Sequence, residues 1–338
     1  MKKIIKKKKE FLLLKFYFIL VFFFFYYLDK SFSPDYLAYS LRFANSEWYL
    51  KNDIAIFFDL LTYIINKSTP LINSQFLIFF TINYLLFSYL IFEFLKLNTK
   101  FYKKNFFLIL IFLFIFIFLF SFEYLIIRLR AGTCILLMFA SFIFFLKNKK
   151  NLSFIFLLCG VLTHIKISLI FIYASFFLIF LKKCKQKNKY QEALFFVILS
   201  FGLVLGVYIF NKFYIFFYDF NYKPLNIYRM LFYCLFPIVW IIYMSKLSNL
   251  FLINKAKNFT EIYLKMLFYF LVFVLFFSLT YYRKYIGEDI LRIFGVFSFI
   301  SIFLLLDAKY FKKIIILNFY ILIINYLLFF KNLIYLLK

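Results

Sequence analysis

Residues 106–127 read FFLILIFLFIFIFLFSFEYLII, a run with a single charged side chain, Glu123. A helix that crosses the hydrocarbon core of a bilayer needs about 20 apolar residues, and this run meets that length. Similar runs recur along the chain, and 66% of its 338 residues are hydrophobic. One soluble core cannot bury so many apolar side chains, so the sequence predicts an all-α, polytopic transmembrane helix bundle.

Short polar connectors separate the apolar runs and divide the chain into about 10–11 expected spans, at about 20 residues for each crossing. Residues 1–338 are therefore expected to form a single integral membrane domain with an external amphipathic segment at about residues 29–70. The first run is followed by no small-residue cleavage site and is expected to remain as a helix. Nine spans are predicted at residues 11–28, 71–95, 106–127, 131–146, 191–211, 229–245, 262–281, 289–306 and 313–330.

The remaining apolar stretch, residues 152–181, is too long for one crossing, because a single helix over it would measure about 45 Å. Lysine clusters at residues 147–150 and 182–185 flank it on both sides. Basic residues mark cytoplasmic connectors, so both flanks are expected in the cytoplasm. The stretch is therefore predicted to be a short helical hairpin that turns at Thr163-His164-Ile165-Lys166. The same rule predicts a bacterial inner-membrane protein with a cytoplasmic N terminus.

Lysine and arginine are distributed differently in this predicted topology. The cytoplasmic connectors use lysine, whereas all six arginines fall outside or at the outer ends of spans. The planar arginine fork grips phosphate and carboxylate groups in a bidentate way, so its confinement to one face predicts anion binding there. The arginines are Arg42, Arg128, Arg130, Arg229, Arg283 and Arg292.

Several classes of function have no support in the sequence. The net charge of +27 would suit nucleic acid, but the lysines lie in short clusters between apolar runs, as in cytoplasmic loops of membrane proteins. The four cysteines lack metal-ligand spacing and His164 is the single histidine, so no metal site is expected. The glycine-rich motifs of nucleotide and dinucleotide sites are missing from the chain, so no cofactor is expected either.

The external segment begins with Ser33-Pro34-Asp35-Tyr36, a pattern that favours the start of a helix. Two interpretations of the segment remain open at this point. It is either an amphipathic helix on the outer surface or a substrate-binding cap whose carboxylates and aromatic faces suit sugars. The polar and aromatic candidates in it are Asp35, Tyr39, Arg42, Glu47, Trp48, Asp53 and Asp59.

Arg128 and Arg130 enter an apolar helix, which costs about 2.5–3.5 kcal/mol for each arginine that reaches the middle of the membrane. Compensation is expected from Glu123, from an external acid, or from an anionic substrate, for which the small residues Ala131 and Gly132 would leave room. The lone His164 is either structural or a proton acceptor at the outer face.

A second arginine-bearing segment, residues 281–292, joins two predicted spans on the outer side. Arg292 lies one turn inside the following span and is a candidate for substrate binding. Arg283 lies beside Lys284 in the short loop, where solvation at the surface is sufficient to explain it.

Two segments of the chain resemble the EpsG and Wzy-like polysaccharide polymerases. They are Ile127-Arg128-Leu129-Arg130-Ala131-Gly132 and, after a basic loop, Leu162-Thr163-His164-Ile165-Lys166-Ile167-Ser168. Asp35-x-x-x-Tyr39 and the late Arg292 are also similar to positions in that family. The family's usual Arg-Gln-x-Leu-Ala run is Arg128-Leu-Arg130-Ala-Gly132 here, so which arginine matches stays open.

The resemblance implies a metal-independent polymerase that joins polyprenyl-diphosphate-linked oligosaccharide repeat units at the outer face. It implies that Arg128, Arg130 and Arg292, with Arg283 as a further contact, bind the diphosphate and stabilise it as the leaving group. His164 would deprotonate the acceptor hydroxyl, with Asp35 and Glu47 as alternatives. Its partners would be the lipid-linked oligosaccharide, membrane lipid and other membrane proteins of polysaccharide assembly.

Two other functions share the outward arginines. One is a ligase or glycosyltransferase with a lipid-linked donor, which usually has a larger external loop or paired acids. The other is a flippase or transporter of the same lipid-linked sugars, for which charges would be spread through a cavity across both leaflets. Because the cations of this chain gather at the outer ends of spans, the sequence favours chemistry over transport.

Overall fold

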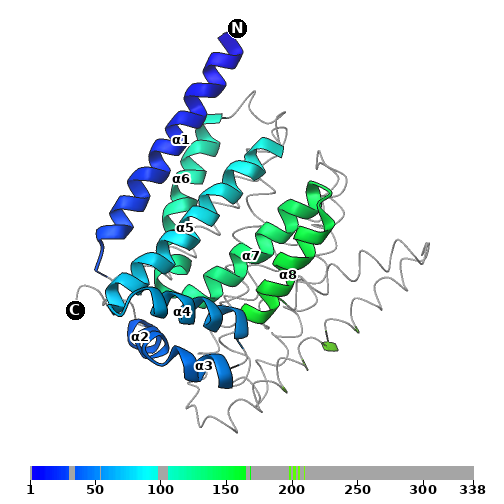
Figure 1. The fold of residues 1–338 in the computed structure, drawn as a ribbon. Helices are drawn as coiled ribbons and strands as arrows, with labels where there is room; N and C mark the ends of the chain where they lie inside the picture. The colour runs from blue at the N-terminus through cyan, green and yellow to red at the C-terminus, as the bar shows by residue number, and fades with distance from the viewer. Residues whose placement is uncertain are drawn as a thin grey trace, which may run out of the picture. The chain divides into compact units, whose positions relative to one another are not determined.

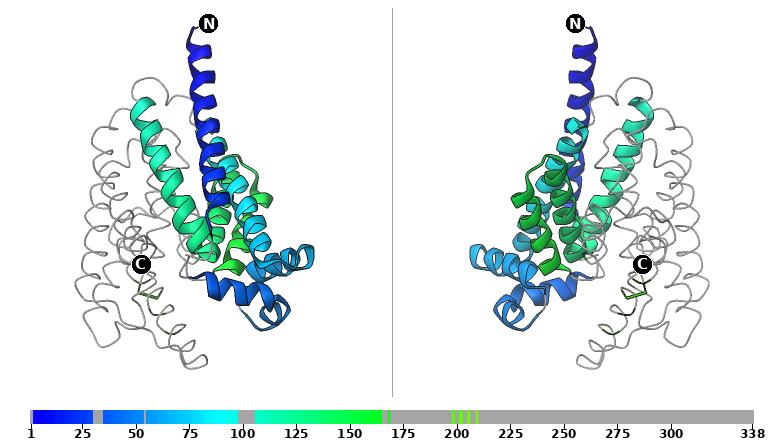
Figure 2. Two further views of the ribbon diagram at one scale, coloured as in Figure 1. Left: turned by 90° about the vertical axis from the view of Figure 1, so that its left-hand side faces the viewer. Right: turned by 90° about the vertical axis from the view of Figure 1, so that its right-hand side faces the viewer.

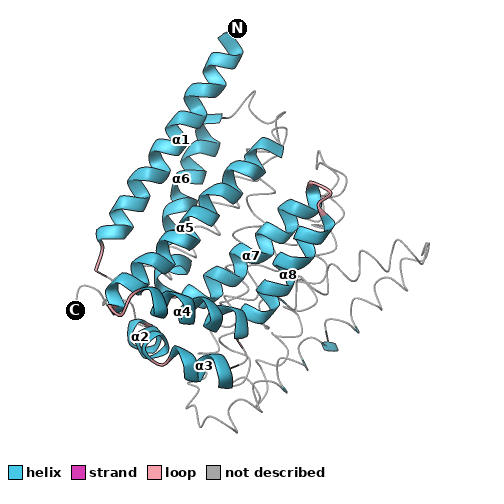
Figure 3. Cartoon of the chain, viewed as in Figure 1, coloured by secondary structure: helices cyan, strands magenta, loops and turns pink. Residues whose placement is uncertain are grey.

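A computed structural model of the chain describes residues 2–29, 35–53, 55–97 and 106–164, together with residues 168, 198, 201, 202, 205 and 209. Within these ranges every regular element is a helix (Figure 3). The chain divides into two units, residues 1–165 with 297–338 and residues 166–296. All helices from α1 to α8 belong to the first unit. Of the five spans predicted after residue 190, the first is described only at residues 198, 201, 202, 205 and 209, and the other four lie outside the described residues.

The described helices fall into a long and a short class (Figure 1). The long ones are α1 (Lys2–Tyr27), α5 (Ile72–Leu97), α6 (Phe106–Phe122), α7 (Leu129–Leu146) and α8 (Lys150–Thr163). The π-helical turn η2 (Glu123–Ile127) continues α6. The short ones are α2 (Tyr36–Ala44), α3 (Ser46–Asn52) and α4 (Ile56–Ser68), which together are called the cap.

The long helices coincide with predicted apolar runs, so the all-helical expectation is confirmed for the described part of the chain. Two of them, over Ile72–Lys96 and Leu129–Leu146, are long and apolar enough to cross a membrane by length and composition. Shorter apolar helices cover Leu12–Tyr27, Leu113–Ile127 and Lys150–Thr163. The first arm of the predicted hairpin at residues 152–181 ends at Thr163, as expected for a turn there, and its second arm lies outside the described residues.

Aromatic side chains join α1, α5 and α6. Phe18 and Phe87 meet edge to face with ring centroids 5.9 Å apart, and Phe87 packs on Phe120 at 4.7 Å. The hydroxyl of Tyr84 donates to the Phe18 carbonyl at 2.6 Å. Large rings bury much area with few rotatable bonds, so they pack these helices closely without a polar core.

Small residues bring α7 and α8 together as an antiparallel pair. Ser141 and Ser153 donate to each other's backbone carbonyls at 2.7 and 2.8 Å. At Gly160, an added Cβ would lie 2.3 Å from the tip of the Met138 side chain, so the two backbones are in close approach there. Cross-helix hydroxyl bonds and small residues are the usual means by which apolar helices associate.

Several lysines lie at the end of α7 and α8 where the chain turns from one helix to the other. Asn148 has φ of 62°, a left-handed conformation that asparagine tolerates better than most residues, and it reverses the chain after α7. Lys147 forms an ion pair with Glu93 near the end of α5, and Lys96 bonds the same carboxylate at 2.7 Å. This end carries the N terminus of α1 as well (Figure 1).

The cap lies at the opposite end of α5 and α7 from that turn, in Figure 1 and in both views of Figure 2. The predicted helix start is confirmed, because α2 begins at Tyr36 directly after Asp35. Phe43 and Phe58 of the cap are fully buried against Phe76 and Phe79 of α5 and Leu129 of α7. Residues 35–68, as far as they are described, therefore form three short helices on a shared apolar core, where one amphipathic helix was one of the two interpretations.

Candidate functional site

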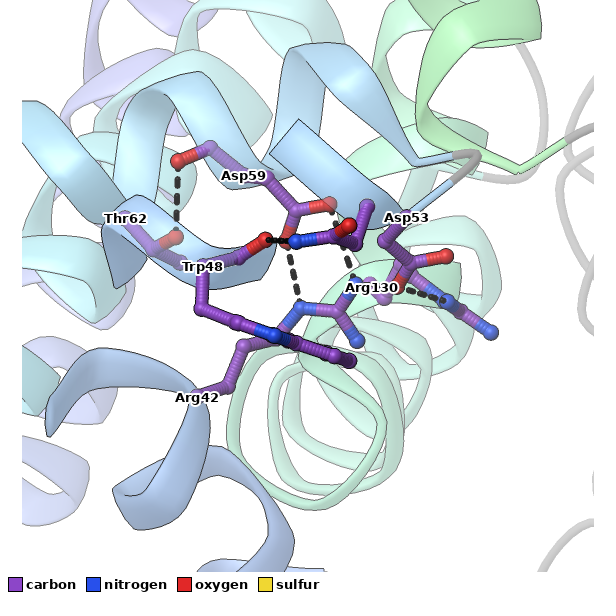
Figure 4. A network of polar contacts seen from close by, with 7 residues as sticks. Arg42, Trp48, Asp53, Asp59, Thr62 and Arg130 are labelled. Carbon is purple, nitrogen blue, oxygen red and sulfur yellow. Dashed lines mark hydrogen bonds and ion pairs between the residues drawn. The ribbon is translucent and has the colours of Figure 1, made fainter. Parts of the chain in front are cut away.

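A buried arginine ties α2 to α4. Arg42 in the last turn of α2 forms a two-point contact with Asp59, through Nε to Oδ1 and through Nη2 to Oδ2 at 3.0 Å (Figure 4). The side chain of Asp59 is 0% exposed. A buried carboxylate is tolerated only when it is paired, so this fork is the reason that Asp59 can face inward.

Two aromatic rings and a second carboxylate complete the surroundings of Arg42. Its guanidinium carbon lies 4.7 Å from the ring centroid of Tyr49 and 5.4 Å from that of Phe58. Nη2 also bonds Asp53, which follows α3 directly. Burial lowers the pKa of Arg42, but the hydrogen bond to Asp59 and the charges of Asp53 and Asp59 outweigh it and raise the pKa above its ordinary value. Arg42 is therefore a permanent cation in the interior of the cap.

Asp59 lies in the first turn of α4, where the positive end of the helix dipole favours a carboxylate. Burial raises the pKa of Asp59 above its ordinary value, while the guanidinium of Arg42 acts in the opposite direction. The protonation state of Asp59 thus depends on Arg42 beside it.

Arg130 connects the cap to the start of α7. Its Nη1 lies 3.8 Å from Oδ2 of Asp53, the carboxylate that Arg42 also contacts. Its backbone N–H donates to the hydroxyl of Tyr39 at 3.3 Å. The side chain of Arg130 is 28% exposed, compared with 12% for Arg42. Of the two arginines, Arg130 is therefore the one at the edge of the cluster.

Tyr39 is held as a neutral phenol. Burial raises its pKa, and the charge of Asp35 raises it further, whereas the nearby Arg130 and Arg42 lower it. Asp35 precedes α2, and its carbonyl accepts the backbone N–H of Tyr39 at 3.0 Å. Asp35 thus lies within electrostatic reach of Tyr39, on which Arg42 and Arg130 also act.

Glu47, the other predicted acid, lies elsewhere on the cap. It bonds Lys67 at 2.9 Å, and the two side chains are 61% and 60% exposed. The hydrogen bond from Lys67 holds the pKa of Glu47 below its ordinary value. Asp53 and Asp59 are the acids that the fold brings to the arginines, and the sequence did not single them out from the other carboxylates of the segment.

Arg128 and His164 flank α7 and α8 at the cap end. Arg128 is the residue before α7, and His164 is the residue after α8, in an extended conformation. His164 is buried, and its carbonyl accepts a weak hydrogen bond from Sγ of Cys134 at 3.6 Å. Both residues are therefore positioned by the ends of the same helix pair.

Gly132 shows why a small residue follows Arg130. A Cβ there would lie 1.8 Å from the carbonyl oxygen of Tyr124, because α7 doubles back over η2 at this point. The expectation that Gly132 leaves room for a ligand is wrong, since the backbone of η2 fills that space. Extra turns of π-helix are frequent beside functional residues. The compensating partner that the structure describes for Arg130 is Asp53.

Arg283 and Arg292 lie outside the described residues, as does the side chain of Glu123. Within residues 12–164, as far as they are described, no group of three or more His, Cys, Asp or Glu side chains is arranged to hold a metal ion. No family model, no curated protein and no solved structure matches the chain.

Proposed function

We propose that the chain is a multi-pass protein of the bacterial inner membrane that polymerises polyprenyl-diphosphate-linked oligosaccharide repeat units at the outer face. The observation that carries the proposal is that all arginines among the described residues lie at the same end of the helices, which they share with Lys51 and Lys67 of the cap. Arg42, Arg128 and Arg130 lie at the cap end, whereas Lys147 and Lys96 lie at the other end with Glu93. Lysines are typical of the cytoplasmic side and arginine forks of phosphate binding.

The membrane location is supported by apolar side chains that face outward on α5, which is long enough to cross, and on the shorter apolar helix Leu12–Tyr27 within α1. Leu85 and Tyr89 are exposed on α5, and Phe16, Leu20 and Phe23 are exposed on α1. Soluble monomers rarely expose contiguous apolar faces of this kind, whereas lipid tails cover them at no cost.

Arg42 and Arg130 have different roles within the proposed site. Arg42 is sealed between Asp53 and Asp59 and organises the cap, so it is a positioning residue. Arg130 lies at the edge of the cluster with a long contact to Asp53, so its fork suits an entering diphosphate. Arg128 precedes it on the same turn, and Arg292 and Arg283 are further candidates from the sequence.

The proposed reaction is a glycosyl transfer. The hydroxyl of the acceptor unit attacks the anomeric carbon of the donor, the bond to the diphosphate breaks, and polyprenyl diphosphate leaves. Arginine forks stabilise the charge that develops on the leaving group. His164 takes the proton of the acceptor hydroxyl, with Asp35 and Glu47 as the alternative bases.

The proposal is tested by the polysaccharide profile of cells that carry Arg130→Ala, Arg130→Lys or the control Lys51→Ala, which removes an exposed cation of the cap. The expected result is loss of long polymer in Arg130→Ala, a partial loss in Arg130→Lys, and normal polymer in the control. Single repeat units should still reach the outer face in all three. Arg130→Lys separates charge from the bidentate fork, because lysine keeps only the charge.

Two outcomes contradict the proposal. Full-length polymer in Arg130→Ala at normal protein level removes the diphosphate role of Arg130. Repeat units trapped on the cytoplasmic face in cells that lack the chain indicate a flippase instead of a polymerase.

A further inference from the structure

The cap buries one pair of charged side chains and exposes several large apolar ones. Arg42 and Asp59 face the interior, as described above. Leu37 and Leu41, one turn apart on α2, face outward, and Leu37 is 70% exposed. A helical element of a soluble protein turns its apolar stripe inward and its charges to water, so these positions of α2 are inverted relative to those of a water-facing helix.

The same inversion holds on α4. Ile56, Leu60 and Ile64 follow one another at intervals of four residues, which places them on one face of the helix. All three are exposed, with Ile64 at 54%, while Asp59 and Thr62 on the same helix are buried. The apolar faces of α2 and α4 are thus present in addition to the apolar core that these helices share with α5.

The outward side chains of the cap have the composition of a bilayer interface. Trp48 on α3 is 55% exposed, and tryptophan is enriched at the boundary between headgroups and acyl chains. Lys67 lies over the ring of Tyr63 at 5.4 Å and keeps its ammonium group in solvent. Leu71, between the cap and α5, is also exposed, so the apolar surface continues from the cap to a helix long enough to cross the membrane.

We propose that the outer faces of α2, α3 and α4 are seated in the boundary between headgroups and acyl chains of the outer leaflet. The partner is a lipid surface, and the contact residues are Leu37, Leu41, Trp48, Leu60 and Ile64. This inference rests on the membrane location proposed above and is independent of the polymerase activity. Amphipathic helices that lie in this plane bury their apolar face in the lipid and leave lysines at the headgroups.

The depth of the cap in the bilayer also sets the depth of the arginine cluster. Arg42 and Arg130 both contact Oδ2 of Asp53, so a cap held at headgroup depth holds Arg130 at that depth as well. A diphosphate carried on a membrane-anchored lipid would meet Arg130 without leaving the bilayer surface.

The experiment uses the two tryptophans of the chain, Trp48 and Trp240. The full-length Trp240→Phe variant reports on Trp48, and the Trp48→Phe variant reports on Trp240, which lies in the predicted span 229–245. Each is reconstituted in phosphatidylcholine vesicles that carry a spin label either near the headgroup or at the middle of the acyl chain. Iodide in the aqueous phase is the complementary quencher. The fluorescence of the wild type minus that of Trp48→Phe gives an independent measure of the Trp48 signal.

We expect the shallow label to quench Trp48 several-fold more strongly than the deep label, and iodide to quench it several-fold less than free tryptophan amide. Strong iodide quenching without lipid quenching overturns the proposal, because the cap then faces water. Shielding from both quenchers also overturns it, because another part of the chain or a second copy then covers the cap. If lipid labels quench neither tryptophan, the membrane location itself fails, whereas quenching of Trp240 alone refutes only the seating of the cap.

Discussion

Replacing Arg42 by methionine is expected to destabilise the cap strongly. Methionine keeps an unbranched apolar chain beside Tyr49 and Phe58, but it leaves Asp59 as a carboxylate whose side chain is 0% exposed. Removing one partner of a buried ion pair typically costs about 3–5 kcal/mol, because the remaining charge has no compensation. A loss of about 1 kcal/mol lowers Tm by about 2–4 °C in proteins of 150–250 residues, so the expected decrease is on the order of 10 °C.

The measurement is thermal unfolding of the purified protein in vesicles, followed by circular dichroism. Lys67→Met is the matched control, because it breaks a charge pair on the same cap whose members are both exposed, and it should leave Tm unchanged. The double variant Arg42→Met with Asp59→Leu removes the orphaned charge. It should regain much of the lost stability, since apolar replacements of buried pairs are often neutral.

The pH dependence of Arg42→Met identifies the source of the loss. Burial raises the pKa of Asp59 and Arg42 lowers it, so removal of Arg42 raises the pKa further. When the folded-state pKa lies above the unfolded value, protonation favours the folded state and the benefit disappears as the pH rises through the folded pKa. The decrease in Tm caused by Arg42→Met should therefore become smaller as the pH falls below neutral.

Three results would refute this reasoning. An unchanged Tm in Arg42→Met would mean that the buried pair with Asp59 does not form in the protein. A double variant no more stable than the single one would mean that the charge of Asp59 is not the cause. A deficit independent of pH would lead to the same conclusion.

Two further predictions concern the helix pair that carries Arg130. Gly132→Ala should lower Tm sharply or abolish folding, because the added Cβ would lie 1.8 Å from the carbonyl oxygen of Tyr124. Gly160→Ala should have a milder effect, since the atom that its Cβ meets is the flexible tip of a methionine. The yield and Tm of the two variants test this contrast, and equal effects would contradict it. The hydroxyls of Ser141 and Ser153 also lie 3.2 Å apart, so replacing the two serines by alanine, singly and together, should give a coupling of about 0.6 kcal/mol in a double-mutant cycle of unfolding free energies, as is typical of hydrogen bonds between membrane helices. Strict additivity would show that the two hydroxyls are not linked.

Helix positions followed from the sequence because apolar length and local capping signals act over short distances. The run at residues 106–127 is continuous in the structure as α6 and η2, and α2 begins after Asp35 as predicted. The resemblance to polysaccharide polymerases directed attention to Arg130, and the structure describes it at the cap end of α7. What it binds there remains the proposal to be tested.

The partners of the arginines could not be predicted in the same way. Arg42 meets Asp59 across 17 positions of the chain, and Arg130 meets Tyr39 across 91. Such contacts depend on how the short helices pack on α5 and α7, and local residue patterns do not encode that packing. For this reason the sequence led to Asp35 and Glu47 as the candidate acids, whereas the acids that contact the arginines are Asp53 and Asp59.

The sequence by itself determined that the described chain is helical and where its apolar helices lie. These properties are set by composition and by the length of each run. Only the tertiary structure decided that Asp59 is buried, that Gly132 is filled by the backbone of η2, and that the cap turns Leu37 and Ile64 outward. Each of these depends on which surfaces of separate helices meet, and that choice is made by close packing of the whole unit.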